Sequence, residues 1–190
     1  MYKQINMRKE GVMENTKENS VTFQNLSQKN MSFDEVFQHI TNFMKKEPSG
    51  KFRLMFGTDS QVFNQYTKFI TGIVIQQERR GVWACIRKVI VPRKMLNLHE
   101  RISYETTLTE EVVSLFTTEH KEQLINIVLP YIYNGANFTI EGHIDIGSGK
   151  RNKTRVFVKE MVARLESIGV EPKIKPESFV ASSYANRFTK

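Results

Sequence analysis

Cysteine is nearly absent from the sequence, and long apolar runs are missing altogether. Cys85, the one cysteine in 190 residues, excludes a disulfide framework or a cysteine-based zinc finger within a single chain. It lies in a predicted strand, where we expect a small buried thiol rather than a nucleophile. No run of about 18 apolar residues occurs, so we expect no transmembrane helix and no membrane partner. Residues 1–30 also lack the apolar core of a signal peptide, which favours a cytoplasmic protein.

Negative charge is scarce relative to positive charge. The net charge is +8, and residues 147–190 hold ten Lys or Arg against four Asp or Glu. This asymmetry favours a polyanionic partner, with nucleic acid first, although a basic surface that only aids solubility would give the same balance. Hydrophobic residues make up 39% and charged residues 25% of the chain, which suits one ordinary globular domain with its own core.

The first 30 residues differ in composition from the rest. Residues 1–30 are rich in Asn, Gln, Lys, Glu and Ser and show no apolar period, which predicts a disordered tail before a single domain at 31–190. Ser32 followed by Glu35 is a capping-box signature, and apolar residues recur behind it at helical spacing until Pro48. We therefore expect an extra N-terminal helix that covers an edge of the main sheet or acts as a lid.

The run from Phe52 to Ser60 predicts the central strand. Its apolar residues occupy both faces, as in a strand that is buried on both sides, and it closes on small and polar residues. Asp59 therefore stands at the end of a buried strand, where α/β sheets usually open into their sites.

The remaining elements mix strands and helices. Runs of β-branched residues predict strands, helical spacing of apolar residues predicts helices, and Gly, Pro and Asn mark the turns between them. In chain order we expect strands at 68–75 and 82–91, helices at 98–118 and 119–133, a strand at 138–146, a helix at 151–167, a short strand at 170–175 and a final helix that opens at 176–178.

One acid falls on the apolar face of the long helix predicted at 98–118. At about 100° per residue, Glu105 lies within the stripe that Leu108 and Phe116 help to form. Burying an acid is costly unless a cation, a metal ion or a functional site receives it. Arg101, in the first turn, is one such cation, so a purely structural explanation stays open beside the functional one.

A second strand end carries another acid. Residues 138–146 alternate between apolar and polar side chains, and Asp145 precedes a loop of small residues. Asp59, Glu105 and Asp145 thus form a candidate site, because converging carboxylates repel one another unless divalent metal such as Mg²⁺ or Mn²⁺ compensates them. Two such ions can activate water and stabilise the leaving oxygen in phosphodiester hydrolysis. The alternative is that the two aspartates only cap loops.

His143 and Ser60 are accessory candidates beside these acids. His143 shares a strand face with Asp145, and three roles stay open for it: a metal ligand, a general base, or a histidine whose hydrogen bonds are satisfied within the sheet. We favour the last of these. Ser60 directly follows Asp59.

The loop at 147–149 and the basic residues after it fail the spacing of a phosphate-binding loop. Ile144 stands five residues before Gly149, where that motif needs glycine, and Arg151 follows Lys150 in place of Ser or Thr. We therefore expect no nucleotide triphosphatase. A glycine loop before a helix can still bind a phosphodiester backbone through nearby cations, and the candidates are Lys150, Arg151, Lys153 and Arg155.

Three short motifs carry a resemblance to a known family. They are Gly57-Thr58-Asp59-Ser60-Gln61, His143-Ile144-Asp145-Ile146-Gly147 and Lys175-Pro176-Glu177-Ser178. In this order, over about residues 33–190, they resemble the YkuK-like family of bacterial proteins, which is grouped with ribonuclease H-like nucleases. The resemblance implies an α/β fold of the ribonuclease H-like kind, a mixed five-stranded sheet in the order 3-2-1-4-5 with an antiparallel strand 2 and flanking helices.

The same resemblance implies a function. In ribonuclease H-like enzymes several acids bind two divalent metals, and these acids map onto Asp59, Glu105 and Asp145. A fourth acid usually starts the last helix, and its counterpart here is Glu177, which departs from the pattern as a longer side chain. We therefore expect a nuclease that uses Mg²⁺ or Mn²⁺ to hydrolyse RNA, RNA–DNA hybrid or structured DNA. Two alternatives stay open: a non-catalytic nucleic-acid-binding protein with a degenerate site, and a structural or partner-binding domain.

Overall fold

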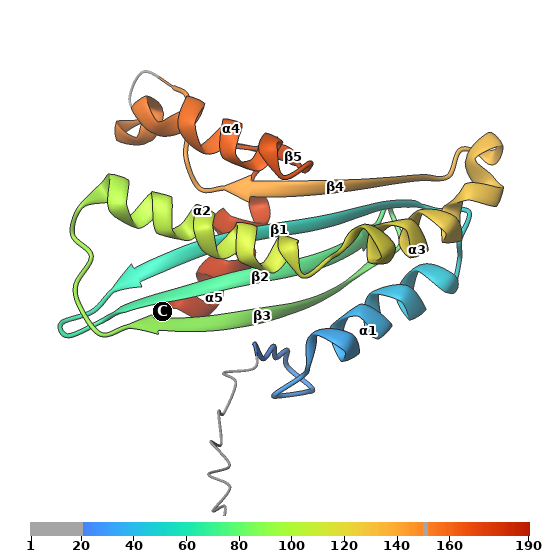
Figure 1. The fold of residues 1–190 in the computed structure, drawn as a ribbon, viewed down its shortest axis with the longest axis horizontal. Helices are drawn as coiled ribbons and strands as arrows, with labels where there is room; N and C mark the ends of the chain where they lie inside the picture. Colours follow the sequence, from blue (N-terminus) through green and yellow to red (C-terminus); the bar gives the residue numbers. More distant parts are fainter. Residues whose placement is uncertain (1–20, 150–151) are drawn as a thin grey trace, which may run out of the picture.

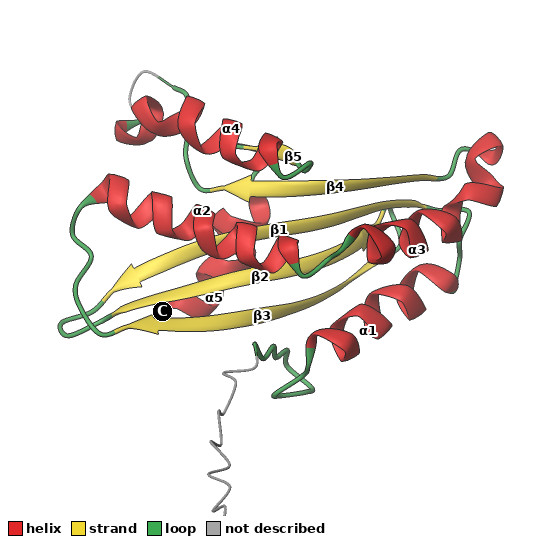
Figure 2. Ribbon diagram, viewed as in Figure 1, coloured by secondary structure: helices red, strands yellow, loops and turns green. Residues whose placement is uncertain are grey.

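A mixed five-stranded sheet forms the centre of the molecule (Figure 2). The computed structural model describes residues 21–149 and 152–190. In these ranges the strands are β1 Lys51–Val62, β2 Thr67–Gln77, β3 Gly81–Val91, β4 Asn137–Ile144 and β5 Glu171–Lys173. Their order is β3-β2-β1-β4-β5, and β1 pairs antiparallel with β2 and parallel with β4. The predicted order and the antiparallel second strand are confirmed.

Helices cover both faces of this sheet (Figure 1). One face carries α1 Phe33–Lys45, α2 Leu98–Ser114, α3 Thr118–Val128 and α4 Val158–Ser167, with 3₁₀ turns η1 Leu129–Asn134 and η2 Lys153–Phe157 between them. The other face carries the C-terminal helix, which is a π-helix at η3 Val180–Ala185 and an α-helix at α5 Asn186–Thr189.

Strand β1 is buried on both sides because its apolar residues alternate between two cores. Phe52, Leu54 and Phe56 belong to the large core that also holds residues of α1, α2, α3 and α4. Met55 points the other way and packs with Val180 of the C-terminal helix. The prediction of a central strand buried on both faces is confirmed.

A pair of glycines lets the C-terminal helix lie close to the sheet. Gly57 of β1 stands opposite Gly72 of β2 in the antiparallel register. A Cβ atom on Gly57 would come within 2.8 Å of the Ala181 backbone nitrogen, and one on Gly72 within 2.8 Å of the Tyr184 ring. The two glycines therefore set how closely the helix approaches the end of β1 that carries Asp59.

Helix α1 begins and ends where the sequence predicts. The Ser32 hydroxyl accepts the Glu35 backbone N–H, and the Glu35 carboxylate accepts the Ser32 backbone N–H, so the capping box is present. Val36, Ile40 and Met44 are fully buried against the sheet and α3.

The tail predicted at residues 1–30 is wrong for its last ten residues. Residues 1–20 lie outside the described residues, but Phe23 is 1% exposed and pairs through its backbone with Met31. Gln24 exchanges two backbone hydrogen bonds with Ile86, of 2.9 and 2.8 Å, and so covers part of the edge strand β3. The polar composition hid this segment because a single aromatic residue and one pair of backbone bonds anchor it.

The final helix begins later than the sequence predicts. The residues from Ile174 to Glu177 form a turn, closed by a hydrogen bond of 2.8 Å from the Glu177 N–H to the Ile174 carbonyl. Helical structure starts only at Phe179, so Glu177 precedes the helix instead of lying in its first turn. None of the helices in the described ranges is long and apolar enough to cross a membrane.

Candidate active site

Asp59 and Asp145 come together because β1 and β4 run parallel and in register. The last paired residues of the two strands are Thr58 and Ile144, and each aspartate directly follows its member of that pair. Neighbouring strands lie about 4.8 Å apart, so the two carboxylates leave the sheet side by side at the same edge. The structure therefore brings the ends of the two strands together, as the sequence predicts.

Glu105 reaches the same edge from the opposite face of the sheet. Since consecutive strand residues point to opposite faces, Asp59 faces the C-terminal helix and Ser60 faces α2. The Ser60 hydroxyl donates a hydrogen bond of 2.5 Å to Glu105 Oε1. Glu105 is 7% exposed, so the helical spacing placed it correctly on the buried face of α2.

Buried hydroxyl groups fix α2 against β1 one turn from Glu105. Thr58 of β1 contacts Thr109 of α2 at 2.8 Å and Thr71 of β2 at 2.9 Å. Thr109 in turn donates to the Glu105 carbonyl oxygen at 3.0 Å. The space behind Glu105, between these threonines and β4, leaves no room for a water molecule. The Glu105 carboxyl is therefore held by packing rather than by solvent.

A second anchor joins α2 to α4. Arg164 of α4 donates to both oxygens of Glu110, at 2.9 and 2.5 Å, and also to the hydroxyls of Ser103 and Thr107. Bidentate guanidinium–carboxylate pairs fix orientation as well as distance. Contacts to β1 and to α4 together fix the orientation of α2, and with it the position of Glu105.

The charges at this edge of the sheet act on one another. Burial raises the pKa of Glu105 to about 8, opposed by the hydrogen bond from Ser60 and increased further by the negative charges of Asp59 and Asp145. Burial likewise raises the pKa of Asp59 to about 6, opposed by the Ser60 backbone N–H and increased by the charge of Asp145. Asp59 and Asp145 therefore lie close enough to Glu105 to disfavour its ionisation, and Asp145 has the same effect on Asp59.

Arg101 does not serve as the structural partner of Glu105. It lies in the first turn of α2, and its positive charge lowers the pKa of both Glu105 and Asp59. In the described part of the chain it forms no ion pair with either carboxylate. The structural alternative for Glu105, a salt bridge to Arg101, is thus replaced by a hydrogen bond from Ser60.

Among the described residues, Lys175 forms an ion pair with Asp145. Its Nζ lies 3.0 Å from Asp145 Oδ1, and its backbone N–H donates to the Ile146 carbonyl at 2.8 Å. The ammonium does not point along a hydrogen-bonding direction, so no donor among the described residues forms a hydrogen bond with Asp145 Oδ1. Asp145 is thus in an ion pair, but its Oδ1 atom accepts no hydrogen bond from the described residues.

The C-terminal helix adds two polar groups beside Asp59. The Thr189 hydroxyl lies 3.3 Å from Asp59 Oδ2, 2.9 Å from the Asn186 carbonyl oxygen and 3.4 Å from the Asn186 side-chain oxygen. The hydroxyl has one proton for these acceptors, so its bond to Asp59 is shared. Thr189 and Asn186 are therefore the polar side chains that the C-terminal helix brings to Asp59.

His143 is satisfied within the sheet, as favoured from the sequence. Its Nδ1 accepts the Val180 backbone N–H at 3.1 Å, which places the proton on Nε2, and Nε2 lies 3.1 Å from Glu141 Oε2. Arg53 donates to both oxygens of Glu141, at 2.7 and 2.6 Å. Both nitrogens of His143 are thus used, and none is left for a metal ion or a proton transfer.

The predicted fourth acid and the predicted basic residues have different outcomes. Glu177 is wrong as a fourth site acid: its side chain is 69% exposed and pairs with Lys173 at 3.7 Å. Lys150 and Arg151 lie outside the described residues, whereas Lys153 and Arg155 are exposed on η2. The Gly147 N–H donates to the Thr154 hydroxyl at 3.2 Å, which ties η2 to the loop that follows Asp145.

The donor set suits a divalent cation in its chemistry, but the ligands are not assembled around one point. Among residues 21–149 and 152–190, no group of three His, Cys, Asp or Glu side chains is arranged to hold a metal ion. Three neighbouring carboxyl groups, two with a raised pKa and the third with an oxygen lacking a hydrogen bond, are nevertheless the hard oxygen ligands that Mg²⁺ and Mn²⁺ prefer. A cation at this edge would relieve the repulsion.

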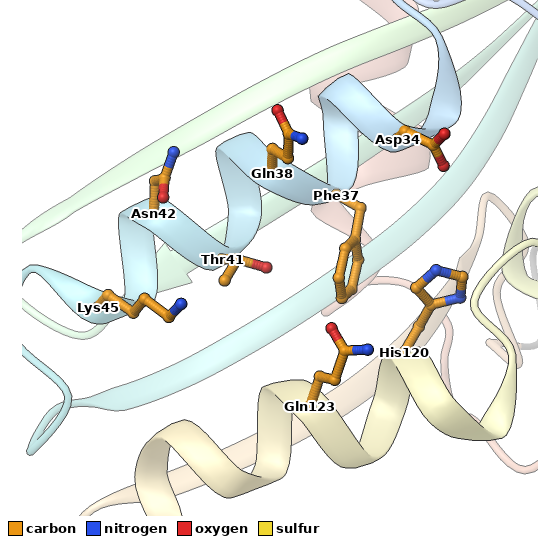
Figure 3. Close-up of a pocket in the computed structure, with 8 residues that line it drawn as sticks. All are labelled: Asp34, Phe37, Gln38, Thr41, Asn42, Lys45, His120 and Gln123. Carbon is orange, nitrogen blue, oxygen red and sulfur yellow. The ribbon is translucent and has the colours of Figure 1, made fainter.

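A hollow of about 450 Å³ lies elsewhere, between α1 and α3 (Figure 3). Phe37 and Thr41 of α1 face His120 and Gln123 of α3 across it, and the Thr41 hydroxyl has no hydrogen-bond partner in the described ranges. Its lining holds one acid, Asp34, so it does not share the chemistry of the carboxylate edge.

Lys175 and Thr189 are the site residues that the sequence did not reveal. Lys175 belongs to the third motif of the resemblance, but the site residue that this motif predicts is the acid Glu177. Thr189 lies 130 residues from Asp59, and no local pattern links the two.

Comparisons with known proteins agree with this architecture. A family described as ribonuclease H-like matches residues 35–190 of the chain. The chain is also 40% identical, over 171 residues, to the uncharacterized protein YkuK of Bacillus subtilis (strain 168). The aligned segment covers 90% of this chain and 98% of that protein. A search of the solved structures finds no significant match. With the family match over most of its length and the sheet order β3-β2-β1-β4-β5, the chain belongs to the ribonuclease H-like family.

Proposed function

We propose that the protein is a divalent-metal-dependent nuclease that hydrolyses phosphodiester bonds in RNA, RNA–DNA hybrid or structured DNA. The observation that carries this proposal is the gathering of Asp59, Glu105 and Asp145 at one edge of the sheet, where burial and neighbouring negative charge raise the pKa of Asp59 and of Glu105. Such an arrangement costs free energy in the folded protein, and functional sites are where that cost is usually found. Membership of the ribonuclease H-like family points the same way.

Each acid has a distinct place in the proposed site. Asp59 and Asp145 would hold Mg²⁺ or Mn²⁺, because they are partly exposed and leave neighbouring strand ends. Glu105 would complete or orient the ligand set, and the Ser60 hydroxyl positions it on the α2 face of the sheet. When bound, the metal would polarise the phosphate and lower the pKa of a bound water.

The basic residues beyond Asp145 would hold the nucleic-acid backbone. Lys153 and Arg155 are exposed on η2, which a hydrogen bond fixes to the loop after Asp145. Lys and Arg contacts to phosphate are independent of sequence and sensitive to salt. We therefore expect binding that weakens steeply with ionic strength and shows little base preference.

Cleavage by an Asp59→Asn variant tests the proposal. Wild-type protein is incubated with Mg²⁺ or Mn²⁺ and end-labelled single-stranded RNA, RNA–DNA hybrid or a branched DNA duplex. We expect metal-dependent cleavage of one of these, and a loss of at least about a hundredfold in Asp59→Asn, because the substitution removes a ligand charge while keeping the side chain's size.

The matched control is Asp34→Asn, which removes an exposed acid in the first turn of α1. It should cleave like the wild type. Equal cleavage by the Asp59→Asn and wild-type proteins would contradict the site assignment.

A nucleic-acid-binding protein without catalysis is the second candidate. The ion pair between Lys175 and Asp145 favours it, since this cation occupies one of the ligands that a metal needs. It predicts salt-sensitive binding with no cleavage in any metal, and the same assay therefore separates the two functions.

A further inference from the structure

Lys175 is the one lysine in the described ranges that forms an ion pair with an acid of the candidate site. Its ammonium lies 3.0 Å from Asp145 Oδ1. Its backbone is fixed beside β4, because the Lys175 N–H donates to the Ile146 carbonyl at 2.8 Å. The position of the residue is therefore set by the sheet, whereas the contact of its side chain with Asp145 depends on rotamers alone.

The ion pair between Lys175 and Asp145 can be broken at little cost in free energy. The Lys175 side chain is 47% exposed, so it can turn into solvent without moving the backbone. The ammonium and the carboxylate oxygen approach at contact distance but do not form a hydrogen bond, and partly exposed pairs of this kind contribute little stability. By contrast, the Arg53–Glu141 pair makes two hydrogen bonds of 2.7 and 2.6 Å.

The charge balance at this edge of the sheet depends on Lys175. The carboxyl groups of Asp59, Glu105 and Asp145 gather at this edge, and Lys175 supplies positive charge through its ion pair with Asp145. A divalent ion added to this arrangement meets an ammonium already seated on a ligand oxygen. Removing the ammonium leaves that oxygen with no partner among the described residues.

We propose that Lys175 is a built-in counter-ion of Asp145, which a divalent cation displaces when it binds. The proposal rests on the function proposed above, because it concerns the same carboxylates. In this proposal Asp145 has a positively charged partner beside the other two acids before any metal ion binds. It also makes the lysine a device that weakens metal affinity, so that the site fills only when Mg²⁺ or Mn²⁺ is abundant.

Metal binding by Lys175→Met tests the proposal without reference to catalysis. Isothermal titration with Mn²⁺ gives the dissociation constant of the full-length wild-type protein and of the variant. Methionine keeps the length of the side chain but removes the charge, and we expect Mn²⁺ to bind about fivefold more tightly or better. Lys175→Arg, which restores the cation, should return the affinity to about the wild-type value.

Lys173→Met is the matched control. It removes one lysine charge two residues away, but Lys173 pairs with Glu171 at 2.6 Å and Glu177 at 3.7 Å instead of with Asp145. Its Mn²⁺ affinity should stay within about twofold of the wild type, as expected for a charge change away from the ligands. Lys175→Gln provides a second neutral variant if Lys175→Met folds poorly, and a heteronuclear NMR spectrum checks the fold of each protein.

The outcomes separate this proposal from the proposed function. Tighter binding in Lys175→Met but not in Lys173→Met supports the counter-ion, even where the wild type binds no measurable Mn²⁺. Unchanged or weaker binding in both neutral Lys175 variants overturns it, and the metal-dependent nuclease then stands or falls by the Asp59→Asn assay. If no protein in the series binds Mn²⁺, both the counter-ion and the metal site are wrong.

Discussion

Two buried glutamates on neighbouring elements of this protein have opposite chemistry. Glu141 lies in β4 and is 3% exposed; Glu105 lies in α2 and is 7% exposed. Burial alone would raise the pKa of Glu141, but hydrogen bonds from His143 and Arg53 bring it down to about 2. Burial raises the pKa of Glu105 to about 8, because the hydrogen bond from Ser60 and the charge of Arg101 do not offset the cost of burial.

The difference lies in the partners and not in the depth of burial. Glu141 accepts four hydrogen-bond contacts from the side chains of Arg53, Thr139 and His143, and that chain continues to the Val180 backbone. Such a network holds the C-terminal helix to the sheet and leaves no lone pair unused. Glu105 has one donor, Ser60, and two acids near it. A buried acid with all its hydrogen bonds formed stabilises the fold. A buried acid beside other acids destabilises it, and such acids are typical of sites that bind a ligand.

Replacing Glu141 should give the largest loss of stability. Glu141→Gln removes the charge that Arg53 and His143 face and presents an amide N–H to their donors. We expect the free energy of unfolding to fall by about 3 kcal/mol, as for other broken buried pairs. Urea denaturation followed by circular dichroism measures it.

Glu105→Gln is the contrasting substitution. It replaces an acid that is mostly neutral at pH 7 by a neutral isostere, so the free energy of unfolding should change by less than about 0.5 kcal/mol. A loss as large as that of Glu141→Gln would erase the distinction between the two acids.

The pH dependence of stability should also separate them. The pKa of Glu105 is raised from 4.5 to about 8 and that of Asp59 from 3.8 to about 6, so the folded protein binds more protons than the unfolded chain at pH 5–8. The stabilisation is complete below the unfolded pKa values and is lost as the pH rises through the folded ones. The free energy of unfolding should therefore fall from pH 5 to pH 8, by up to about 1.4 kcal/mol per pH unit for each titrating group.

Denaturation curves of the wild type and Glu105→Gln at pH 5, 6, 7 and 8 check this slope. The variant should lose most of the slope above pH 7, because Asp59, with a pKa of about 6, is mostly ionised there. A wild-type protein whose stability rises across this range would show that Glu105 is compensated in solution.

The sequence predicts the acids of the site but not their surroundings. Asp59 and Asp145 are visible because each ends an apolar strand, and Glu105 because it interrupts the apolar stripe of α2. These signals are local. The sheet order followed from the resemblance of three short motifs, and the structure and the family match confirm it.

The errors share a physical cause, which is contact between distant segments. Lys175 reaches Asp145 from a turn 30 residues later, and Thr189 reaches Asp59 across 130 residues. Glu177 looked like a helix-start acid, but the turn at its position delays the helix to Phe179 and leaves the side chain exposed. Phe23 packs into the core from within a polar segment, which composition alone cannot separate from the tail.

Paramagnetic broadening by Mn²⁺ tests the central claim most directly. In a heteronuclear NMR titration with substoichiometric Mn²⁺, resonances near the ion disappear first. The account predicts earliest loss at Asp59, Glu105 and Asp145, and later loss at Arg53 and Glu141, whose network has no place for a cation. Broadening that begins around Glu141, or none at all up to millimolar Mn²⁺, would contradict a metal site at the ends of β1 and β4.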